Sequence, residues 1–240
     1  MIQVDGLFKN FDDFAALKGV SLYVETGSIY GLIGVNGSGK TTLIKHIAGV
    51  FKADKGSVKL DGFDVYDNSH VKERVGYIPD DLFFFQGYNL KGMAKFYSRI
   101  YPNWSQDRFD ALLADFNLPV NKSLSKFSKG MQKQAAFLLV ISTKPDFLIL
   151  DEPVDGLDPL VRHKLWKYVM ADVADRQMTV LISSHNLREL EGVCDSIGIL
   201  SAGQMKAERR HLDELEETIE QVFLNEMGGE DDEEIKAFLD

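Results

Sequence analysis

Cysteine is almost absent from this sequence of 240 residues, and Cys194 is its single occurrence. One cysteine cannot form an internal disulfide, so the sequence fits a reducing compartment. Its neighbours Val193 and Ile197 favour a packed thiol over a reactive one. The chain also lacks an apolar run near the roughly 20 residues that a membrane helix needs. The first ten residues alternate and carry Asp5, so we expect no signal peptide there.

An excess of basic residues is missing as well. The formal net charge is −10, and the segment 226–240 carries seven acidic residues against one lysine. The remaining residues have a small acidic excess, which implies no strongly basic face and weighs against nucleic acid as a partner. We expect an acidic tail at 226–240, mobile at 228–234, because such charge density cannot bury a core.

A glycine-rich stretch stands out among the remaining features. Gly34 to Thr41 has the pattern Gly-x-x-x-x-Gly-Lys-Thr, between an apolar run at 29–35 and a helical pattern that starts at Thr41. Glycines let a backbone wrap around an anion at a helix N-terminus, so the pattern predicts a phosphate-binding loop. Lys40 would supply a charge for the β- and γ-phosphates, and the Thr41 hydroxyl can ligate Mg²⁺. The alternative is a chance glycine-rich turn, which the flanking strand and helix disfavour. The predicted ligands are ATP and Mg²⁺, and the loop residues expected to bind ATP are Gly34, Asn36, Gly37, Ser38, Gly39, Lys40, Thr41 and Thr42.

Short apolar runs alternate with helical patterns along the chain, which predicts an α/β fold with a parallel sheet flanked by helices. Strands are expected at 2–7, 16–24, 29–35, 75–79, 147–150, 178–183 and 195–200, and a small hairpin at 58–65. Turns are expected at 9–12, 26–28, 55–57 and 202–203. Helices are expected at 41–50, 89–100, 105–116, 131–141, 159–174, 186–193 and 211–226, with Asn89, Ser105 and Ser128 as N-caps. We therefore predict one P-loop NTPase domain at 1–225, with a small antiparallel β part near the N-terminus. Its α/β core is at 1–79 and 147–225, with an all-helical insert at 80–146.

Two carboxylates follow the apolar run at 147–150. Asp151, at the strand end, is the predicted Mg²⁺ partner opposite Lys40. Glu152 can polarise an attacking water as a general base. The alternative is two acids that end a strand in solvent, and the compact turn from Pro153 to Asp158 disfavours it.

Together these residues resemble the nucleotide-binding subunit of an ATP-binding-cassette (ABC) transporter, over about residues 1–225. The stretch 34–41 is similar to its Walker A motif, and 147–152 to its Walker B motif with the catalytic glutamate. The stretch 124–132, Leu-Ser-Lys-Phe-Ser-Lys-Gly-Met-Gln, resembles the family signature, which other P-loop families lack. The stretches 156–158 and 183–185 resemble its D-loop and switch histidine.

The resemblance implies a head-to-tail dimer of two cassettes, copies of this chain or a related subunit, with two ATP molecules at the interface. Ser128 and Gly130 of one subunit would contact the γ-phosphate held by Lys40 of the other, and Asp158 would also lie at the ATP site. Without the resemblance, Ser128 would be read as a helix cap alone. His185 would hydrogen-bond the γ-phosphate and assist Glu152 and Lys40 in catalysis; its alternative is a structural histidine.

The resemblance also implies an aromatic ring stacked on adenine. Phe11 occupies that place in the sequence. The alternative for Phe11 is a core phenylalanine, in which case Phe14 is its substitute.

The sequence departs from the family pattern at Asp80 and within the signature. Asp80 stands where the family usually has a glutamine that contacts Mg²⁺; a carboxylate can ligate the ion but has a shorter reach. In the signature, Phe127 and Lys129 replace the commoner leucine and glycine, and Met131 follows Gly130. Such Ser-Lys-Gly-Met signatures are similar to those of bacterial exporters, so we expect export over import.

The resemblance leads to one expected function. We expect an ATP-hydrolysing subunit in the cytoplasm, peripheral on the inner face of the cell membrane, whose ATP-driven dimerisation moves a separate integral membrane permease. The aromatic run Phe83-Phe84-Phe85, near Tyr88, either receives a helix of that permease or packs locally. The alternatives are a soluble ABC ATPase that acts on a non-transport complex, and a nucleotide-binding module without turnover.

Overall fold

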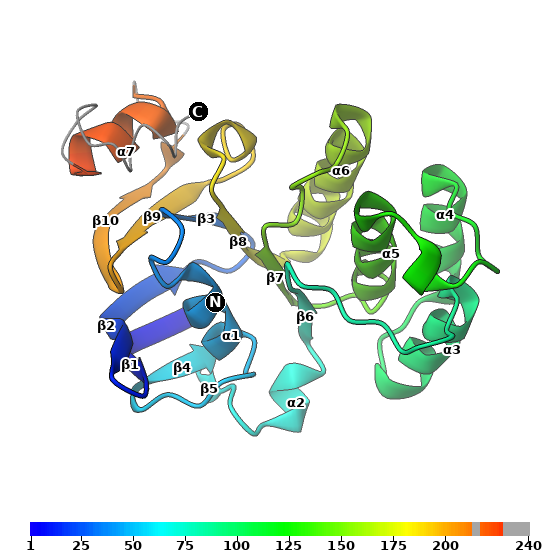
Figure 1. Cartoon of the computed structure of the whole chain (residues 1–240), viewed down its shortest axis with the longest axis horizontal. Coiled ribbons are helices and arrows are strands. Elements are labelled where there is room, and N and C mark those ends of the chain that lie inside the picture. Colours follow the sequence, from blue (N-terminus) through cyan, green and yellow to red (C-terminus); the bar gives the residue numbers. More distant parts are fainter. Residues whose placement is uncertain (213–216, 228–240) are drawn as a thin grey trace.

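A six-stranded sheet forms the centre of the computed structural model, which describes residues 1–212 and 217–227 (Figure 1). The strand order is β10-β9-β3-β8-β7-β6. The parallel strands are β3 (Ile29–Ile33), β6 (Val75–Ile78), β7 (Phe147–Asp151), β8 (Thr179–Ser184) and β9 (Ser196–Ser201). The edge strand β10 (Gln204–Arg210) pairs antiparallel with β9. The predicted α/β fold with a parallel sheet is confirmed, and the carboxyl ends of its strands share one edge.

A second, antiparallel sheet packs near the N-terminus, in the order β2-β1-β4-β5. Its strands are β1 (Ile2–Phe11), β2 (Phe14–Val24), β4 (Lys55–Leu60) and β5 (Phe63–Asp64). Helix α1 (Lys40–Ile47) lies between the two sheets. Its buried face, Leu43, Ile44 and Ile47, joins one hydrophobic cluster with residues of both sheets, and this cluster fixes the helix that follows the glycine-rich loop.

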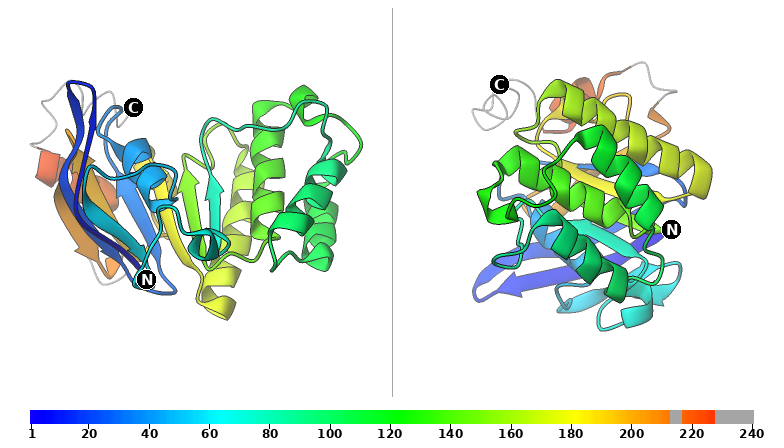
Figure 2. Two further views of the ribbon diagram at one scale, coloured as in Figure 1. Left: turned by 90° about the horizontal axis from the view of Figure 1, so that it is seen from below. Right: turned by 90° about the vertical axis from the view of Figure 1, so that its right-hand side faces the viewer.

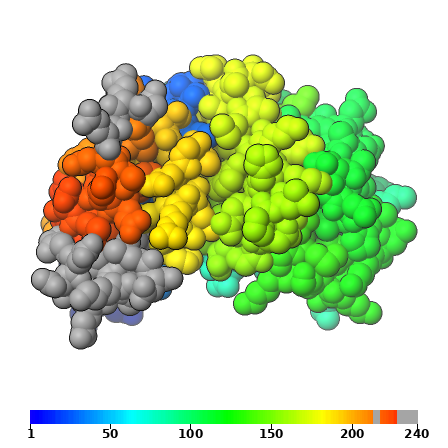
Figure 3. Space-filling view, turned by 90° about the horizontal axis from the view of Figure 1, so that it is seen from above, coloured from blue at the N-terminus to red at the C-terminus, as the bar shows by residue number. Residues whose placement is uncertain are grey.

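Between β6 and β7 the chain forms helices α3 (Leu90–Ile100), α4 (Gln106–Phe116) and α5 (Lys129–Ile141), with a 3₁₀ turn, η1 (Leu124–Lys126). These helices gather at the end of the molecule opposite the antiparallel sheet (Figure 2). The long helix α6 (Pro159–Arg176) lies between them and the C-terminal elements (Figure 3). A second hydrophobic cluster joins the insert to the other face of the central sheet. The remaining helical elements are α2 (Ser69–Lys72), η2 (Leu187–Glu189) and α7 (Ile219–Met227).

The predicted helix caps are confirmed. Asn89, Ser105 and Ser128 accept hydrogen bonds from the main-chain N–H groups three residues further on. Each satisfies a donor that the first helical turn leaves free. Among the described residues, no helix combines the length and apolar character needed to cross a bilayer.

Two predicted turns near the N-terminus are wrong. A turn is predicted at 9–12, but strand β1 continues through Phe11, and the chain reverses direction at Asp12-Asp13. The turn predicted at 55–57 is the start of β4. Gly56 has φ +84°, and an added Cβ would lie 2.2 Å from the Gly6 carbonyl oxygen. The glycine therefore marks a bulge inside the sheet, where the register between β1 and β4 shifts.

Other differences lie near the C-terminus. The helix predicted at 186–193 is only the 3₁₀ turn η2, followed by turns in which Gly192 has φ +72°. Within the helix predicted at 211–226, the described helix α7 begins at Ile219, while 213–216 lie outside the described residues. The predicted mobile segment 228–234 also lies outside them. The sequence did not predict α2 or β10.

Candidate functional site

The loop between β3 and α1 is built on glycines that no other residue could replace without strain. An added Cβ at Gly34 would lie 2.2 Å from the Leu200 carbonyl oxygen, and Gly39 has φ +108°. The loop, with Phe14, Asp80 and Glu152, lines a pocket of about 340 Å³. The pocket is lined by Asn36, Gly37, Ser38, Gly39, Lys40, Thr41 and Thr42 from the predicted ATP-binding set. Main-chain N–H groups at a helix N-terminus form an anion site, so this pocket can hold phosphate.

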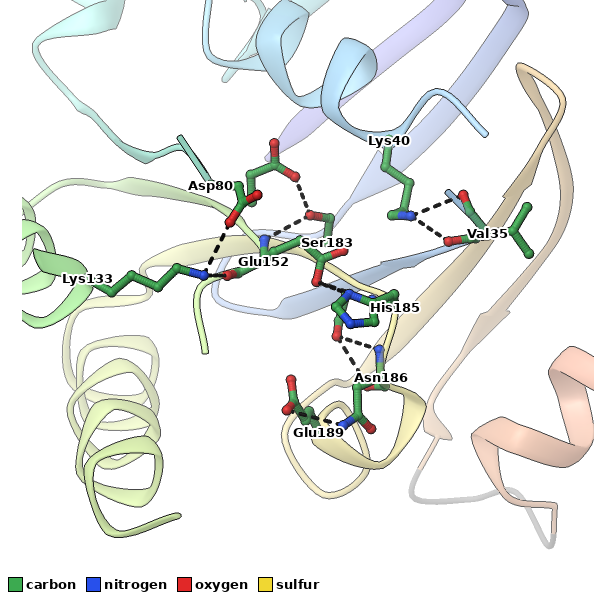
Figure 4. Close-up of polar contacts among 12 residues, drawn as sticks. Val35, Lys40, Asp80, Lys133, Glu152, Ser183, His185, Asn186 and Glu189 are labelled. Atoms are coloured by element: carbon green, nitrogen blue, oxygen red, sulfur yellow. Dashed lines mark hydrogen bonds and ion pairs between the residues drawn. The ribbon is translucent and has the colours of Figure 1, made fainter. Parts of the chain in front are cut away.

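Lys40 is the first residue of α1 and is 7% exposed. Its Nζ donates hydrogen bonds to the main-chain oxygens of Gly34 and Val35 (Figure 4). Burial lowers the pKa of Lys40, although the nearby carboxylates of Glu152 and Asp151 act in the opposite direction. A cation that is poorly solvated and faces the loop gains much from an anionic ligand.

Asp151 is the last residue of β7, and only one of the two oxygens of its buried carboxylate has a hydrogen-bond partner in the described part of the chain. Its Oδ1 accepts a hydrogen bond of 2.6 Å from the Ser183 hydroxyl on β8. Its Oδ2 is buried and has no hydrogen-bond partner in the described part of the chain. Thr41 lines the same pocket as Lys40. Mg²⁺ binds through one or two carboxylates together with substrate phosphates, so an orphaned carboxylate oxygen beside a phosphate loop fits this ion.

Glu152 has a strained backbone, with φ +49°. Its N–H faces the Ser183 hydroxyl and carbonyl oxygens, at 3.1 and 3.3 Å. Its carboxylate Oε2 lies 2.8 Å from Nδ1 of His185 and accepts a bond of 3.3 Å from the His185 main-chain N–H (Figure 4). Left-handed backbone in a residue with a side chain is concentrated at functional sites. β7 and β8 thus place Glu152 and His185 together, next to the Lys40 pocket.

Asp80, the third predicted metal ligand, also lines the pocket. Its Oδ1 lies 3.2 Å from Nζ of Lys133, a residue of α5 that the sequence reasoning missed. Lys133 is 8% exposed, and its Nζ also donates to the main-chain oxygen of Glu152, at 2.7 Å. A signal was available, because a lysine within a stretch as apolar as 131–141 needs a buried partner.

Ser128 and Gly130 lie outside this pocket within the same chain. Ser128 is exposed, and its Oγ caps α5 by accepting a bond from the Met131 N–H. An added Cβ at Gly130 would lie 3.4 Å from Leu157. The signature and the turn 156–158 are therefore neighbours. Asp158 caps α6 by accepting a bond from the Val161 N–H.

The aromatic residues have varied surroundings. Phe14, which is 65% exposed, lines the pocket, whereas the Phe11 ring packs edge-on against Phe51 with 5.6 Å between centroids. Phe11 is not buried in the core, since 41% of it is exposed.

In the insert, Phe83 is 79% exposed, while the neighbouring Phe85 packs against Phe96 of α3.

Cys194 is a buried free thiol, as predicted, and burial raises its pKa.

Comparisons with known proteins agree on one family. A family model described as "ABC transporter" matches residues 17–155. The ABC transporter ATP-binding protein YtrB of Bacillus subtilis (strain 168) is 35% identical over 217 residues, which cover 90% of this chain and 74% of YtrB. Nod factor export ATP-binding protein I of Burkholderia orbicola (strain AU 1054) is 33% identical over 207 residues, covering 83% and 67% of the two chains. A solved structure of an ATP-binding subunit of an ABC transporter has a TM-score of 0.83 at 27% identity and covers 99% of both chains.

Proposed function

This chain belongs to the ABC transporter ATP-binding family, whose members hydrolyse ATP, and we propose that it drives an exporter by ATP-dependent dimerisation. The dimer is formed by two cassettes, copies of this chain or one copy with a related subunit. Its closure moves a separate integral membrane permease, to which the chain binds from the cytoplasmic face.

We assign a separate role in hydrolysis to each side chain at the carboxyl edge of the central sheet. Lys40 and the loop N–H groups bind the β- and γ-phosphates. Thr41 and Asp151 would hold Mg²⁺, which would neutralise phosphate charge. Glu152 accepts a proton from the attacking water. His185 contacts the Glu152 carboxylate at 2.8 Å, and in our proposal its imidazole hydrogen-bonds the γ-phosphate.

The proposed dimer is supported mainly by one observation: Ser128 does not line the phosphate pocket of its own chain. Ser128 heads α5 at an exposed helix N-terminus, which suits an anion, yet the pocket with Lys40 is lined by neither Ser128 nor Gly130. The signature of one chain can therefore serve the γ-phosphate bound by Lys40 of a second chain. The turn 156–158 lies beside the signature and would join the same interface.

Export and the permease rest on further observations. The signature Ser128-Lys-Gly-Met131 resembles those of bacterial exporters, and one relative's printed name is an export ATP-binding protein. The exposed Phe83 beside Phe85 and Tyr88 offers an apolar surface on the helical insert. A helix of the permease that buries this surface would link the insert to the membrane subunit.

Light scattering after size exclusion tests the dimer with the Glu152→Gln variant. We expect a monomer without nucleotide and a dimer with ATP and Mg²⁺, because binding is retained while turnover stops. Ser128→Glu in the same background should remain monomeric, since it places a carboxylate against the γ-phosphate. A Glu152→Gln protein that turns over ATP at the normal rate would remove Glu152 from its role. A Ser128→Glu protein that still dimerises would refute the composite site.

Coupling needs a separate test. We expect a membrane protein that co-purifies with this chain, co-reconstituted with it in proteoliposomes, to increase ATP hydrolysis by the cassette. A Phe83→Asp substitution should abolish the increase but leave the ATPase rate of the isolated cassette unchanged. If the membrane protein has no effect on hydrolysis, the proposed coupling is refuted, and a non-transport complex becomes the next partner to test.

A further inference from the structure

Lys133 is a buried cation of the helical insert whose side chain reaches Glu152 at the carboxyl edge of the central sheet. It lies on α5, five residues after the Ser128 cap, and its side chain is 10% exposed. An ammonium group in such a place is costly unless charge and hydrogen bonds compensate it. The compensation comes from Asp80 and from the Glu152 carbonyl oxygen.

The two contacts of Lys133 differ in what they fix. The hydrogen bond to the Glu152 carbonyl, at 2.7 Å, holds the peptide group directly after the strained Cα of that residue. The Glu152 N–H is held on its other side by Ser183. Because both peptide groups are held, the left-handed backbone is maintained and the direction of the Glu152 carboxylate is set.

The second contact concerns Asp80, whose side chain is 56% exposed. Its Oδ1 lies 3.2 Å from the Lys133 ammonium, so the aspartate neutralises the lysine at the pocket wall (Figure 4). Because the Lys133 ammonium already neutralises this exposed carboxylate, the carboxylate attracts a second cation such as Mg²⁺ less strongly. Asp80 thus differs from Asp151, because its charge is paired with Lys133, whereas Oδ2 of Asp151 is buried and has no hydrogen-bond partner in the described part of the chain.

We propose that Lys133 is a positioning residue for Glu152, and that Asp80 acts through Lys133 as its counter-ion and not as a ligand of Mg²⁺. Three segments meet at the Lys133 ammonium: the helix that carries the signature, the end of β6 and the end of β7. The inference rests on the proposed role of Glu152 as the general base.

A double-mutant cycle with Lys133→Met and Asp80→Asn tests the proposal. Methionine keeps the volume and apolar stem of the lysine, and Asp80 is exposed enough to be solvated without its partner. We expect Lys133→Met to lower kcat on the order of 100-fold, because the base is misplaced, with ATP affinity by calorimetry within a factor of about 2. Asp80→Asn should lower kcat less, because Lys133 still donates to the Glu152 carbonyl. In the Lys133→Met background, Asp80→Asn should have no further effect.

A metal readout separates the two roles of Asp80. Mn²⁺ binding to the ATP complex, followed by electron paramagnetic resonance, should be unchanged by Asp80→Asn and weakened by Asp151→Asn. The matched controls are Lys95→Met, at an exposed position of α3, and Asp81→Asn, at the exposed neighbour of Asp80. Both should keep the wild-type kcat.

The outcomes that overturn the inference are distinct from those that overturn the proposed function. Unchanged kcat in Lys133→Met removes the positioning role, as does a parallel loss of ATP binding and thermal stability, which would show a structural role. Weaker Mn²⁺ binding in Asp80→Asn would make Asp80 a metal ligand, and an additive effect in the double variant would show that Asp80 does not act through Lys133. Full turnover in Glu152→Gln would instead refute the general base itself.

Discussion

The hydroxyl of Ser183 links the two carboxylates of the site, and removing it should be more costly than removing an ordinary buried hydroxyl. Ser183 is fully buried, donates to Asp151 Oδ1 at 2.6 Å and accepts from the Glu152 N–H at 3.1 Å. A hydrogen bond to a charged group contributes about 1.5–3 kcal/mol. The other oxygen of Asp151 has no partner in the described part of the chain, so the variant Ser183→Ala leaves a buried carboxylate almost unsupported.

Ser142 provides the matched control. It is equally buried, and its Oγ donates at 2.6 Å to the neutral carbonyl of Leu138. Such a bond contributes about 0.5–1.5 kcal/mol. We therefore expect Ser183→Ala to lower the free energy of unfolding by about 1 kcal/mol more than Ser142→Ala does.

Urea denaturation monitored by circular dichroism measures both losses. A domain of this size loses about 2–4 °C in Tm per kcal/mol, so Ser183→Ala should lower the Tm by about 3–12 °C. It should also slow ATP hydrolysis, whereas Ser142→Ala should not. Equal destabilisation by the two substitutions would refute the reasoning, because the Ser183 hydroxyl bonds a charged carboxylate and the Glu152 N–H, whereas the Ser142 hydroxyl bonds a neutral carbonyl.

Three further predictions concern Lys40, the aromatic pair Phe11 and Phe14, and His46. Lys40→Ala should weaken ATP binding by about 10- to 100-fold, the loss of a charge-assisted hydrogen bond; unchanged affinity by calorimetry would contradict it. The double variant Phe11→Ala/Phe14→Ala should lose about 1–3 kcal/mol of ATP-binding free energy if adenine stacks at this turn, and the single variants identify the ring. Burial lowers the pKa of His46, whose Nδ1 bonds the Thr42 carbonyl. The folded state thus binds fewer protons than the unfolded one, and stability should fall as pH drops below about 6.5. In urea titrations at pH 7 and 5, His46→Asn should flatten this decline, and an unaltered pH slope would exclude His46 as its source.

Local patterns predicted most elements of the central sheet and the helix caps correctly. Asn89, Ser105 and Ser128 need only the N–H groups three residues further on, so their capping role can be read from the sequence. The wrong predictions are of another kind. Gly56 looks like a turn residue, but its positive φ serves a bulge against Gly6, fifty positions away in the sequence.

The sequence by itself determined the phosphate loop, the carboxylates at the end of β7 and the family to which the chain belongs. These features consist of residue types at fixed short spacings, and the chemistry of phosphate binding requires those spacings. Only the tertiary structure joined Lys133 to Asp80 and Glu152, and Ser183 to Asp151. Those contacts connect residues that are close together because strands β6, β7 and β8 are parallel neighbours and α5 packs against their sheet. No local pattern encodes such pairs, because a partner can offset the cost of burying a charge only after the fold has brought the two residues together.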